Sequence, residues 1–541
     1  MGNGPGSPAD YQAILESYER FCGAFVWEWI DHGLTGHDEL GRPYYRHGGD
    51  IDAQPNGGRY CLDGLLFPDR TPSPGLAELR KAIEPVGIAV ERGSVVVTNK
   101  HDMIDLGHLA FRWFVEVDGV RAGAVRADGV RAAGGPLPVP HCGARESVRV
   151  PLPEVAVAAE GETWLTVEAT LATATRWAPA GHVIATGQSR LGPAPHRRRP
   201  PRPAPGASGS AAAASGSAAS GSGQGTSGSS SGASSASASG SAVVGSLGRD
   251  GVELRGDGRA GGGGLWLGAA AFDGGTGRLL RLGEVELAGP VLDVWRAPTE
   301  NDRGQGPRNA LAADWEAVGL DRFLHRTGDI ERPDDRTLVV HGRSGPATRT
   351  LGFRTTCTWH WQDGALTLRI EAEPVGDWHD TAYGHLSVTP PRIGARFGLP
   401  GGYTEVTWFG RGPGESYADS RAAALVGRYA RSIDAFQTPY IVPQENGNHV
   451  ETRWIEVSGP GLATLRVDGE PHLDFTARRW TSEALQAARR PHDLRDSGRV
   501  WLNLDHGQQG IGSASCGPAL PERYRLPVQT YSWSMTLTVV D

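Results

Sequence analysis

Alternation of apolar and polar side chains is the dominant pattern between residues 88 and 191. Phe111, Trp113, Val115 and Val117 recur at every second position, and residues 163–168 repeat this spacing. A period of two places successive side chains on opposite faces of a strand. Asp-Gly pairs at 118–119 and 128–129 indicate turns between such strands. About 100 residues of this kind predict a small β-sandwich.

Short strand patterns also fill residues 247–541. They are clearest in residues 278–283, 337–341, 365–371 and 532–540. Helical patterns are scarce in this region, and residues 482–490 carry the best of them. The pattern predicts a large antiparallel β domain made of two packed sheets.

Residues 1–86 differ from both regions and predict a mixed α/β segment. A helix is expected over residues 9–22, followed by the apolar run 24–30. A second helix is expected over residues 74–83, because Leu76, Leu79 and Ile83 fall on one face at helical spacing.

A stretch of low complexity separates the β regions. Residues 206–245 are almost entirely Gly, Ser and Ala, and a Pro/Arg-rich stretch precedes them. Such a composition buries too little apolar surface to offset the entropy of ordering, so residues 192–246 are predicted to be a disordered linker. A formal GxGxxG at Gly223–Gly228 has no strand before it and no helix after it, which argues against a dinucleotide site.

Limited proteolysis should cut the chain first within residues 200–244 and leave two resistant pieces, because this tract offers a protease little burial or hydrogen bonding. The protease must have broad specificity, since the tract carries no Lys or Arg beyond Arg202. Mass spectrometry of the first fragments measures this. Early cuts confined to residues 247–541 would contradict the predicted boundary.

Bulk composition narrows the class of protein. A length of 541 residues implies several domains, and a net charge of −8 argues against a nucleic-acid partner. Five scattered cysteines, an odd number without a CxxC pair, fit free buried thiols in a reducing compartment. The sequence shows neither a secretory leader pattern nor 18 consecutive apolar residues, so we expect a cytoplasmic protein.

Several motifs resemble the long-chain β-galactosidases of glycoside hydrolase family 2. The motifs are, in chain order, 23–33 (GAFVWEWIDHG), 60–65 (YCLDGL), 295–302 (WRAPTEND), 408–417 (WFGRGPGESY), 443–447 (PQENG), 501–505 (WLNLD) and 516–518 (CGP). The resemblance covers the whole chain except the linker. It implies a C-terminal remnant of a (β/α)8 barrel at 1–86, an immunoglobulin-like sandwich at 88–191 and a β-supersandwich at 247–541.

The same resemblance implies that the catalytic groups are absent. Retaining glycosidases need two carboxyl groups about 5–5.5 Å apart, as nucleophile and acid/base. In this family the nucleophilic glutamate lies a few residues before a Met-Gly-Asn stretch, which here is Met1-Gly2-Asn3. The acid/base and the main magnesium ligands lie further upstream. We therefore assign no catalytic residue and expect the isolated chain to be inactive.

Five residues occupy positions that resemble binding positions of the family. Trp27 matches a tryptophan of the galactose pocket, where an indole ring suits the apolar face of a pyranose. Cys516 stands where some relatives place a sugar-stacking tryptophan, which puts that contact in doubt. Tyr60, through its carbonyl, and Asp63 resemble sodium ligands, and Asn56 resembles a residue near a second divalent metal. Magnesium and sodium are thus implied, while a capped turn explains Asp63 equally well.

Three further residues and one loop also need an interpretation. Glu28 follows Trp27 and falls on the opposite face of an expected strand, so we expect it to form a structural pair, and Asp31 likewise. The loop 296–302 resembles a segment that approaches the active site. His449 has no metal-ligand spacing, and we assign it to the surface or to strand pairing.

Three hypotheses follow. In the first, the chain is the C-terminal portion of a retaining β-galactosidase acting on substrates such as lactose. An N-terminal or large-subunit chain would then supply both glutamates. The complete enzyme is expected to form homo-oligomers. Alternatively, the chain is a non-catalytic carbohydrate-binding or scaffolding protein, or a truncated reading frame. The DNA upstream of Met1 would distinguish among them.

Overall fold

The computed structural model describes residues 4–51, 58–91, 93–122, 134–152, 161–192, 264–304, 310–379 and 388–540. All of these residues belong to one structural unit. The predicted linker lies outside the described residues except for Gly192. No helix in the described ranges combines the length and the apolar character that crossing a membrane would need.

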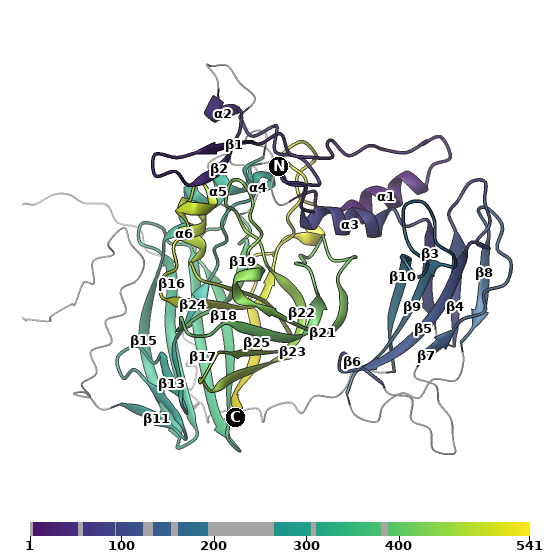
Figure 1. Ribbon diagram of the computed structural model, residues 1–541. Helices are drawn as coiled ribbons and strands as arrows, with labels where there is room; N and C mark the ends of the chain where they lie inside the picture. The colour runs from purple at the N-terminus through teal and green to yellow at the C-terminus, as the bar shows by residue number, and fades with distance from the viewer. Residues whose placement is uncertain are drawn as a thin grey trace, which may run out of the picture. The chain divides into compact units, whose positions relative to one another are not determined.

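The N-terminal segment has three helices and a hairpin (Figure 1). They are α1 (Pro8–Glu16), β1 (Leu34–His37), β2 (Pro43–Arg46), α2 (Gly48–Ile51) and α3 (Pro74–Ala82). Helix α1 ends six residues before the predicted end at residue 22. The reason is local, because both the amide and the hydroxyl of Ser17 donate to the carbonyl of Ile14 and close the last turn.

Helix α3 confirms the second predicted helix, but its buried side chain is not one of the apolar three. Glu78 is 5% exposed, whereas Ile83 is 53% exposed. The Glu78 carboxylate accepts hydrogen bonds from the amides of Ala422 and Ala423, each at 2.9 Å. Charge-assisted bonds of this kind make the burial of a carboxylate tolerable and fix α3 to a loop of the C-terminal domain.

The predicted strand at residues 24–30 is wrong as a strand. In the described residues this stretch is extended but irregular, and its only bridge joins Ile30 to Leu66. Phe25 is fully exposed, and Trp27 and Trp29 are 80% and 61% exposed. A barrel strand needs a neighbour on each side, and the described part of the chain provides one side only.

Residues 86–191 form two packed sheets with a shared apolar core, as the alternation predicted. One sheet has the order β3 (Val86–Glu91), β4 (Ser94–Asn99) and β8 (Ser147–Pro151). The other has the order β10 (Val183–Leu191), β9 (Thr163–Leu171), β5 (Leu109–Val117) and β6 (Val120–Arg121), with β7 (Gly134–Pro136) paired to β5. The Asp118-Gly119 turn joins β5 to β6, with both residues at positive φ.

The C-terminal region contains one antiparallel sheet of 15 strands in its described residues. Its strands are β11 (Leu265–Leu267), β12 (Ala270–Phe272), β13 (Leu279–Leu282), β14 (Val285–Asp293), β15 (Phe323–Asp334), β16 (Thr337–Pro346), β17 (Gly352–Gln362), β18 (Ala365–Val375), β19 (Arg392–Pro400), β20 (Glu405–Gly412), β21 (Leu425–Ser432), β22 (His449–Ser458), β23 (Thr464–Arg478), β24 (Arg499–Gln508) and β25 (Tyr531–Val540). Its helices α4 (Glu300–Arg303), α5 (Leu311–Val318) and α6 (Ser482–Ala487) are short; α6 ends before the predicted residue 490.

The predicted large antiparallel β domain is confirmed, and its two packed halves are joined by continuous hydrogen bonding into one sheet. Strand β23 has 15 residues. Residues 464–470 pair with β25 and residues 474–478 pair with β24, while β22 pairs with residues 465–468, 473 and 475. One long strand thus belongs to both halves of the domain, which curl around a common apolar core (Figure 1).

Two smaller predictions hold only in part. Of the two places expected for His449, strand pairing is confirmed and the surface is wrong, because His449 is fully buried in β22, paired with Phe475 of β23 and stacked on its ring at 5.2 Å between centroids. Burial lowers its pKa to about 4, so the ring is neutral. The cysteines were expected to be buried, but Cys22 and Cys516 are exposed.

Candidate functional site

The Trp27 segment is held against residues 61–66 by backbone hydrogen bonds. The amide of Glu28 donates to the carbonyl of Asp63 at 3.0 Å, and the amide of Leu65 donates back to Glu28 at 3.0 Å. The ladder continues with two more bonds. The amide of Leu66 donates to the carbonyl of Trp29, and the amide of Asp31 donates to the carbonyl of Leu66. Gly64 permits the close approach, because a Cβ there would collide with the backbone of residues 30 and 31. The ladder holds the backbone from Glu28 onward, directly after Trp27, and leaves the Trp27 indole exposed.

Three carboxylates gather behind this ladder. Asp31 Oδ1 accepts from the Gly64 amide at 2.8 Å, and Glu28 Oε2 lies 3.0 Å from His32 Nε2. Burial raises the pKa of Asp31 to about 6, and the charges of Asp63 and Glu28 push it in the same direction. Burial and Glu28 likewise raise the pKa of Asp63. Mutual repulsion of this kind favours binding of a proton or a cation.

Asp63 Oδ1 is buried and has no hydrogen-bond partner among the described residues. A buried carboxylate oxygen without a donor is costly, and a hard cation would satisfy it. Tyr60 stands on the same segment with an exposed side chain. In the described ranges no group of three or more His, Cys, Asp or Glu side chains forms a metal site. Asn56 lies outside the described residues.

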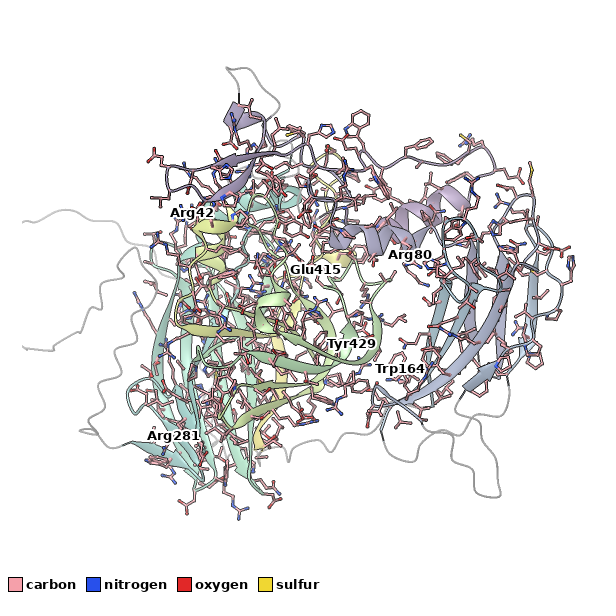
Figure 2. The ribbon with its side chains drawn as sticks, in the orientation of Figure 1. Arg42, Arg80, Trp164, Arg281, Glu415 and Tyr429 are labelled. Carbon is pink, nitrogen blue, oxygen red and sulfur yellow. The ribbon has the colours of Figure 1, made fainter. Side chains whose placement is uncertain are left out.

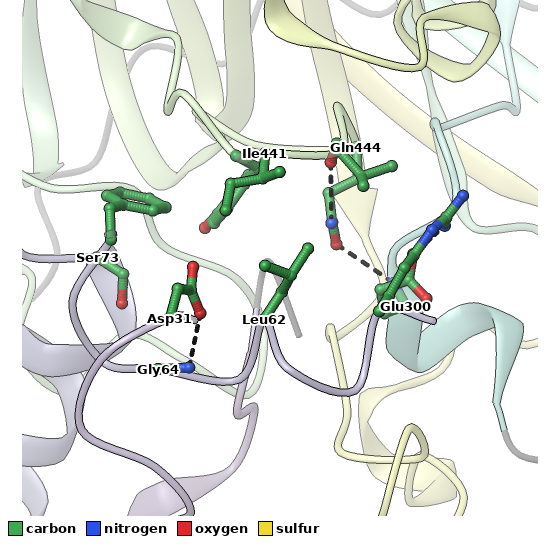
Figure 3. Close-up of a pocket in the computed structure, with 11 residues that line it drawn as sticks. Asp31, Leu62, Gly64, Ser73, Glu300, Ile441 and Gln444 are labelled. Atoms are coloured by element: carbon green, nitrogen blue, oxygen red, sulfur yellow. Dashed lines mark hydrogen bonds and ion pairs between the residues drawn. The ribbon is translucent and has the colours of Figure 1, made fainter. Parts of the chain in front are cut away.

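A crevice runs between this segment and the C-terminal domain (Figure 3). Asp31, Leu62, Gly64 and Ser73 line one side, and Ile441 and Gln444 belong to the opposite side. The same crevice is also lined by Arg59, Phe67, Glu300, Tyr440 and Val442.

Two contacts close the crevice. Arg59 forms an ion pair with Glu300, whose own amide donates to Gln444 Oε1 at 3.2 Å. The rings of Phe67 and Tyr440 meet edge to face at 5.8 Å between centroids. Loop 296–302 thus reaches this crevice through Glu300, and its predicted approach to the active site stays a prediction.

A partly exposed acid supports the C-terminal wall. Glu415 accepts from the amide of Gly447 at 2.7 Å, from Thr438 at 3.2 Å and from the Tyr440 hydroxyl at 3.3 Å. Burial raises the pKa of Glu415 to about 7, and these donors oppose the shift. Figure 2 labels this partly exposed side chain within the C-terminal domain. Its hydrogen bond from the Tyr440 hydroxyl holds Tyr440 at the crevice.

Loop 296–302 is itself rigid. Arg296 pairs with Asp302 at 2.6 Å and donates to the carbonyls of Gln509 and Gly510. Asn301 donates to the carbonyl of Gly512, and Thr299 caps α4. These buried contacts hold Glu300 in place against Arg59.

Models of known families match the chain in three consecutive stretches. The glycosyl hydrolases family 2 TIM barrel domain matches residues 1–88, and β-galactosidase domain 4 matches residues 95–192. The β-galactosidase small chain matches residues 268–537. The chain belongs to glycoside hydrolase family 2. The fold predicted by resemblance, mostly β with a barrel remnant, is thereby confirmed.

Curated relatives in this family carry the name β-galactosidase. That of Arthrobacter sp. (strain B7) is 34% identical, with 96% of this chain and 47% of the relative covered. That of Kluyveromyces lactis is 28% identical over 99% of this chain and 46% of the relative. That of Aeromonas hydrophila is 29% identical over 99% of this chain and 47% of the relative. This family 2 chain thus spans about half the length of the curated relatives it matches.

Within this family 2 chain, three of the predicted site residues share one region. Trp27, Tyr60 and Asp63 lie on the two hydrogen-bonded segments described above. Cys516 is exposed in a separate segment that contacts α1, where Tyr11 Oη lies 2.8 Å from Ser513 Oγ. Glu28 and Asp31 form the structural contacts that the sequence predicted.

Sequence reasoning missed the residues that close the crevice. Arg59 and Glu300 are 241 positions apart, and Tyr440 and Gln444 come from a third segment. The motifs at 295–302 and 443–447 marked two of these segments. No local pattern pairs one segment with another.

Proposed function

We propose that this chain is part of a retaining β-galactosidase that hydrolyses terminal β-D-galactosides such as lactose. Membership of family 2 and the printed names of its relatives support the reaction class. The observation that carries the proposal is the aromatic surface of Phe25, Trp27 and Trp29. These three side chains are exposed, although the backbone from Glu28 to His32 is hydrogen-bonded to residues 61–66.

Trp27 is proposed as a wall of the galactose pocket. A flat indole covers the apolar C–H face of a pyranose, and its N–H offers a donor to a hydroxyl. The exposed ring of Trp27 is available for such a contact. Cys516 is proposed at the rim of the same pocket, where a thiol gives a smaller contact surface than an aromatic ring.

A sodium ion is proposed to bind at Asp63 and at the carbonyl of Tyr60. The residues fit, because Asp63 Oδ1 is buried without a donor and its neighbours Glu28 and Asp31 add negative charge. When bound, the cation would supply positive charge next to substrate hydroxyls. Asp63 would then orient the adjacent Gly64 loop. Magnesium is expected with the complete enzyme, with Asn56 near a second divalent site.

The chain is proposed to act only with a partner that supplies both catalytic glutamates. Such a partner would contain the remaining barrel strands and would cover Phe25 and Trp29, while Trp27 would stay open to the sugar. Burial of each of these large side chains contributes about 1.5–3 kcal/mol, so the interface is favourable. The glutamates would act as nucleophile and acid/base about 5–5.5 Å apart.

An assay with an aryl β-galactoside tests the proposal. The chain alone should give no hydrolysis above buffer, and neither should the unmatched part of the Arthrobacter sp. (strain B7) enzyme alone, whereas their mixture should turn over. Hydrolysis by the repurified chain alone would show that its own carboxylates suffice. An inert mixture, together with galactoside binding by the lone chain, would favour a non-catalytic carbohydrate-binding protein.

A further inference from the structure

One peptide group, between Asp63 and Gly64, is bound at both of its polar ends. Its carbonyl accepts a hydrogen bond from the amide of Glu28 at 3.0 Å. Its N–H donates to Asp31 Oδ1 at 2.8 Å (Figure 3). Because a peptide group is planar, two bonds at its opposite ends fix the orientation of the whole group.

The first of these two bonds leads directly to Trp27. The N–H that the Asp63 carbonyl accepts belongs to the peptide group between Trp27 and Glu28. The orientation of that group determines where the Trp27 side chain leaves the backbone. Since Trp27 is 80% exposed, neighbouring side chains do little to hold the indole. Its position therefore depends on the backbone hydrogen bonds.

The second bond ends on a carboxylate that is costly to bury. Asp31 is only 9% exposed, and burial of a charged group is tolerated when strong donors meet it. The amide of Asp31 also donates to the carbonyl of Leu66 at 2.9 Å. Asp31 thus binds residues 64–66 twice, once through its side chain and once through its backbone. The bond to its carboxylate is of the stronger, charge-assisted kind.

The backbones that this carboxylate holds together are in direct contact. A Cβ on Gly64 would lie 2.2 Å from the amide nitrogen of Asp31 and 2.4 Å from the carbonyl carbon of Ile30. Without the Asp31 carboxylate, the Gly64 N–H would lose the acceptor that the structure provides. An amide without an acceptor costs free energy, and one end of the peptide group would then be free to turn.

We propose that Asp31 is a positioning residue for Trp27, because its carboxylate fixes the Asp63–Gly64 peptide group and that group fixes the backbone behind the indole. The inference rests on the proposed function, in which Trp27 contacts the galactose ring. In this role Asp31 contacts no substrate and acts through its acceptor oxygen rather than through its charge. An asparagine at this position, which keeps the oxygen, should therefore replace it.

Hydrogen exchange of the chain alone tests whether Asp31 fixes the backbone. Asp31→Ala should speed exchange of the Gly64 and Glu28 amides, whereas Asp31→Asn should leave both amides protected. The matched control is Asp69→Ala, because Asp69 Oδ1 accepts from the Thr71 amide at 2.9 Å in an exposed turn of the same segment. That variant should change exchange near Thr71 only. Unchanged exchange of Gly64 and Glu28 in Asp31→Ala would overturn the inference, whether or not any mixture is active.

The mixture with the unmatched part of the Arthrobacter sp. (strain B7) enzyme tests the effect on the pocket. Asp31→Ala should raise KM for an aryl β-galactoside about tenfold, the effect of one lost hydrogen bond, whereas Asp31→Asn and Asp69→Ala should not. In the Trp27→Ala background, Asp31→Ala should cost much less, because the indole that it positions is gone. Equal losses in both backgrounds, or an equal loss in Asp31→Asn, would overturn the inference. An inert mixture with the unmodified chain would count against the proposed function, and the exchange test would then decide the inference.

Discussion

Mixing this chain with the unmatched part of the Arthrobacter sp. (strain B7) enzyme should slow amide exchange at residues 24–30 strongly. In the chain alone these residues have one hydrogen-bonded side and three exposed aromatic rings. A second neighbouring strand would satisfy the other backbone groups and bury Phe25 and Trp29. Hydrogen exchange with mass spectrometry measures the change. Strong protection of residues 24–30 before mixing would contradict the incomplete-barrel interpretation.

Within the mixture, Trp27→Ala should lower kcat/KM by roughly 100-fold, which corresponds to about 2.7 kcal/mol of transition-state stabilisation. Assembly should change less, because the backbone ladder from Glu28 to Leu66 does not use the indole. Trp27→Phe should recover part of the activity by restoring an apolar ring. The matched control is Trp177→Ala, which removes another exposed tryptophan from a different domain and should leave kcat/KM unchanged. Equal losses in both variants would refute the pocket role of Trp27.

Arg392→Met should destabilise the C-terminal domain by about 3–5 kcal/mol. Arg392 is fully buried, 2.9 Å from Asp505 and 3.3 Å from Glu445 in its ion pairs. It also donates to the carbonyl of Trp295 and to Ser482. Its removal leaves the buried carboxylates of Asp505 and Glu445 without much of the positive charge that offsets the cost of their burial. Chemical denaturation followed by tryptophan fluorescence measures the loss.

The deficit of Arg392→Met should shrink as the pH falls. Burial already raises the pKa of Asp505 well above its usual value, and Arg392 opposes that shift. Without the arginine, the folded-state pKa rises further above the unfolded value. Ionisation then costs folding free energy as the pH increases, so the variant should be relatively more stable at pH 5 than at pH 8.

The matched control is Arg354→Met. Arg354 pairs with Glu373 at 2.8 Å across β17 and β18, but both side chains are more than half exposed. Solvent screens such a pair, and its loss should cost less than about 1 kcal/mol. Similar losses for Arg392→Met and Arg354→Met would show that the buried network contributes no more than a surface pair.

Local patterns predicted the strands well, since the alternation in residues 111–117 and 163–168 reports directly which face is buried. Local patterns failed where segments distant in sequence determine whether a residue is buried or paired in a sheet. The apolar run 24–30 has the composition of a buried strand but lacks a second neighbour in the described residues. His449 has no apolar signature, yet three aromatic rings surround it.

The candidate site was predictable only in part for the same reason. Trp27, Tyr60 and Asp63 stand in motifs that can be recognised by position, and the structure places them on adjacent segments. The ion pair of Arg59 with Glu300 and the hydrogen bond of Gly64 with Asp31 join segments that are separated in sequence. Their chemistry depends on strand order and register, which a single sequence does not specify.

Strand β23 has a practical consequence for dividing the chain into separately produced pieces. Because it pairs with β22, β24 and β25 at once, a break inside residues 464–478 would remove partners from three strands together. A cut within residues 193–263 would interrupt none of the described strand pairs. Split reporters or tethered two-piece versions of this protein should therefore be divided within residues 193–263. Residues 264–540 should be kept whole as a single expressed piece.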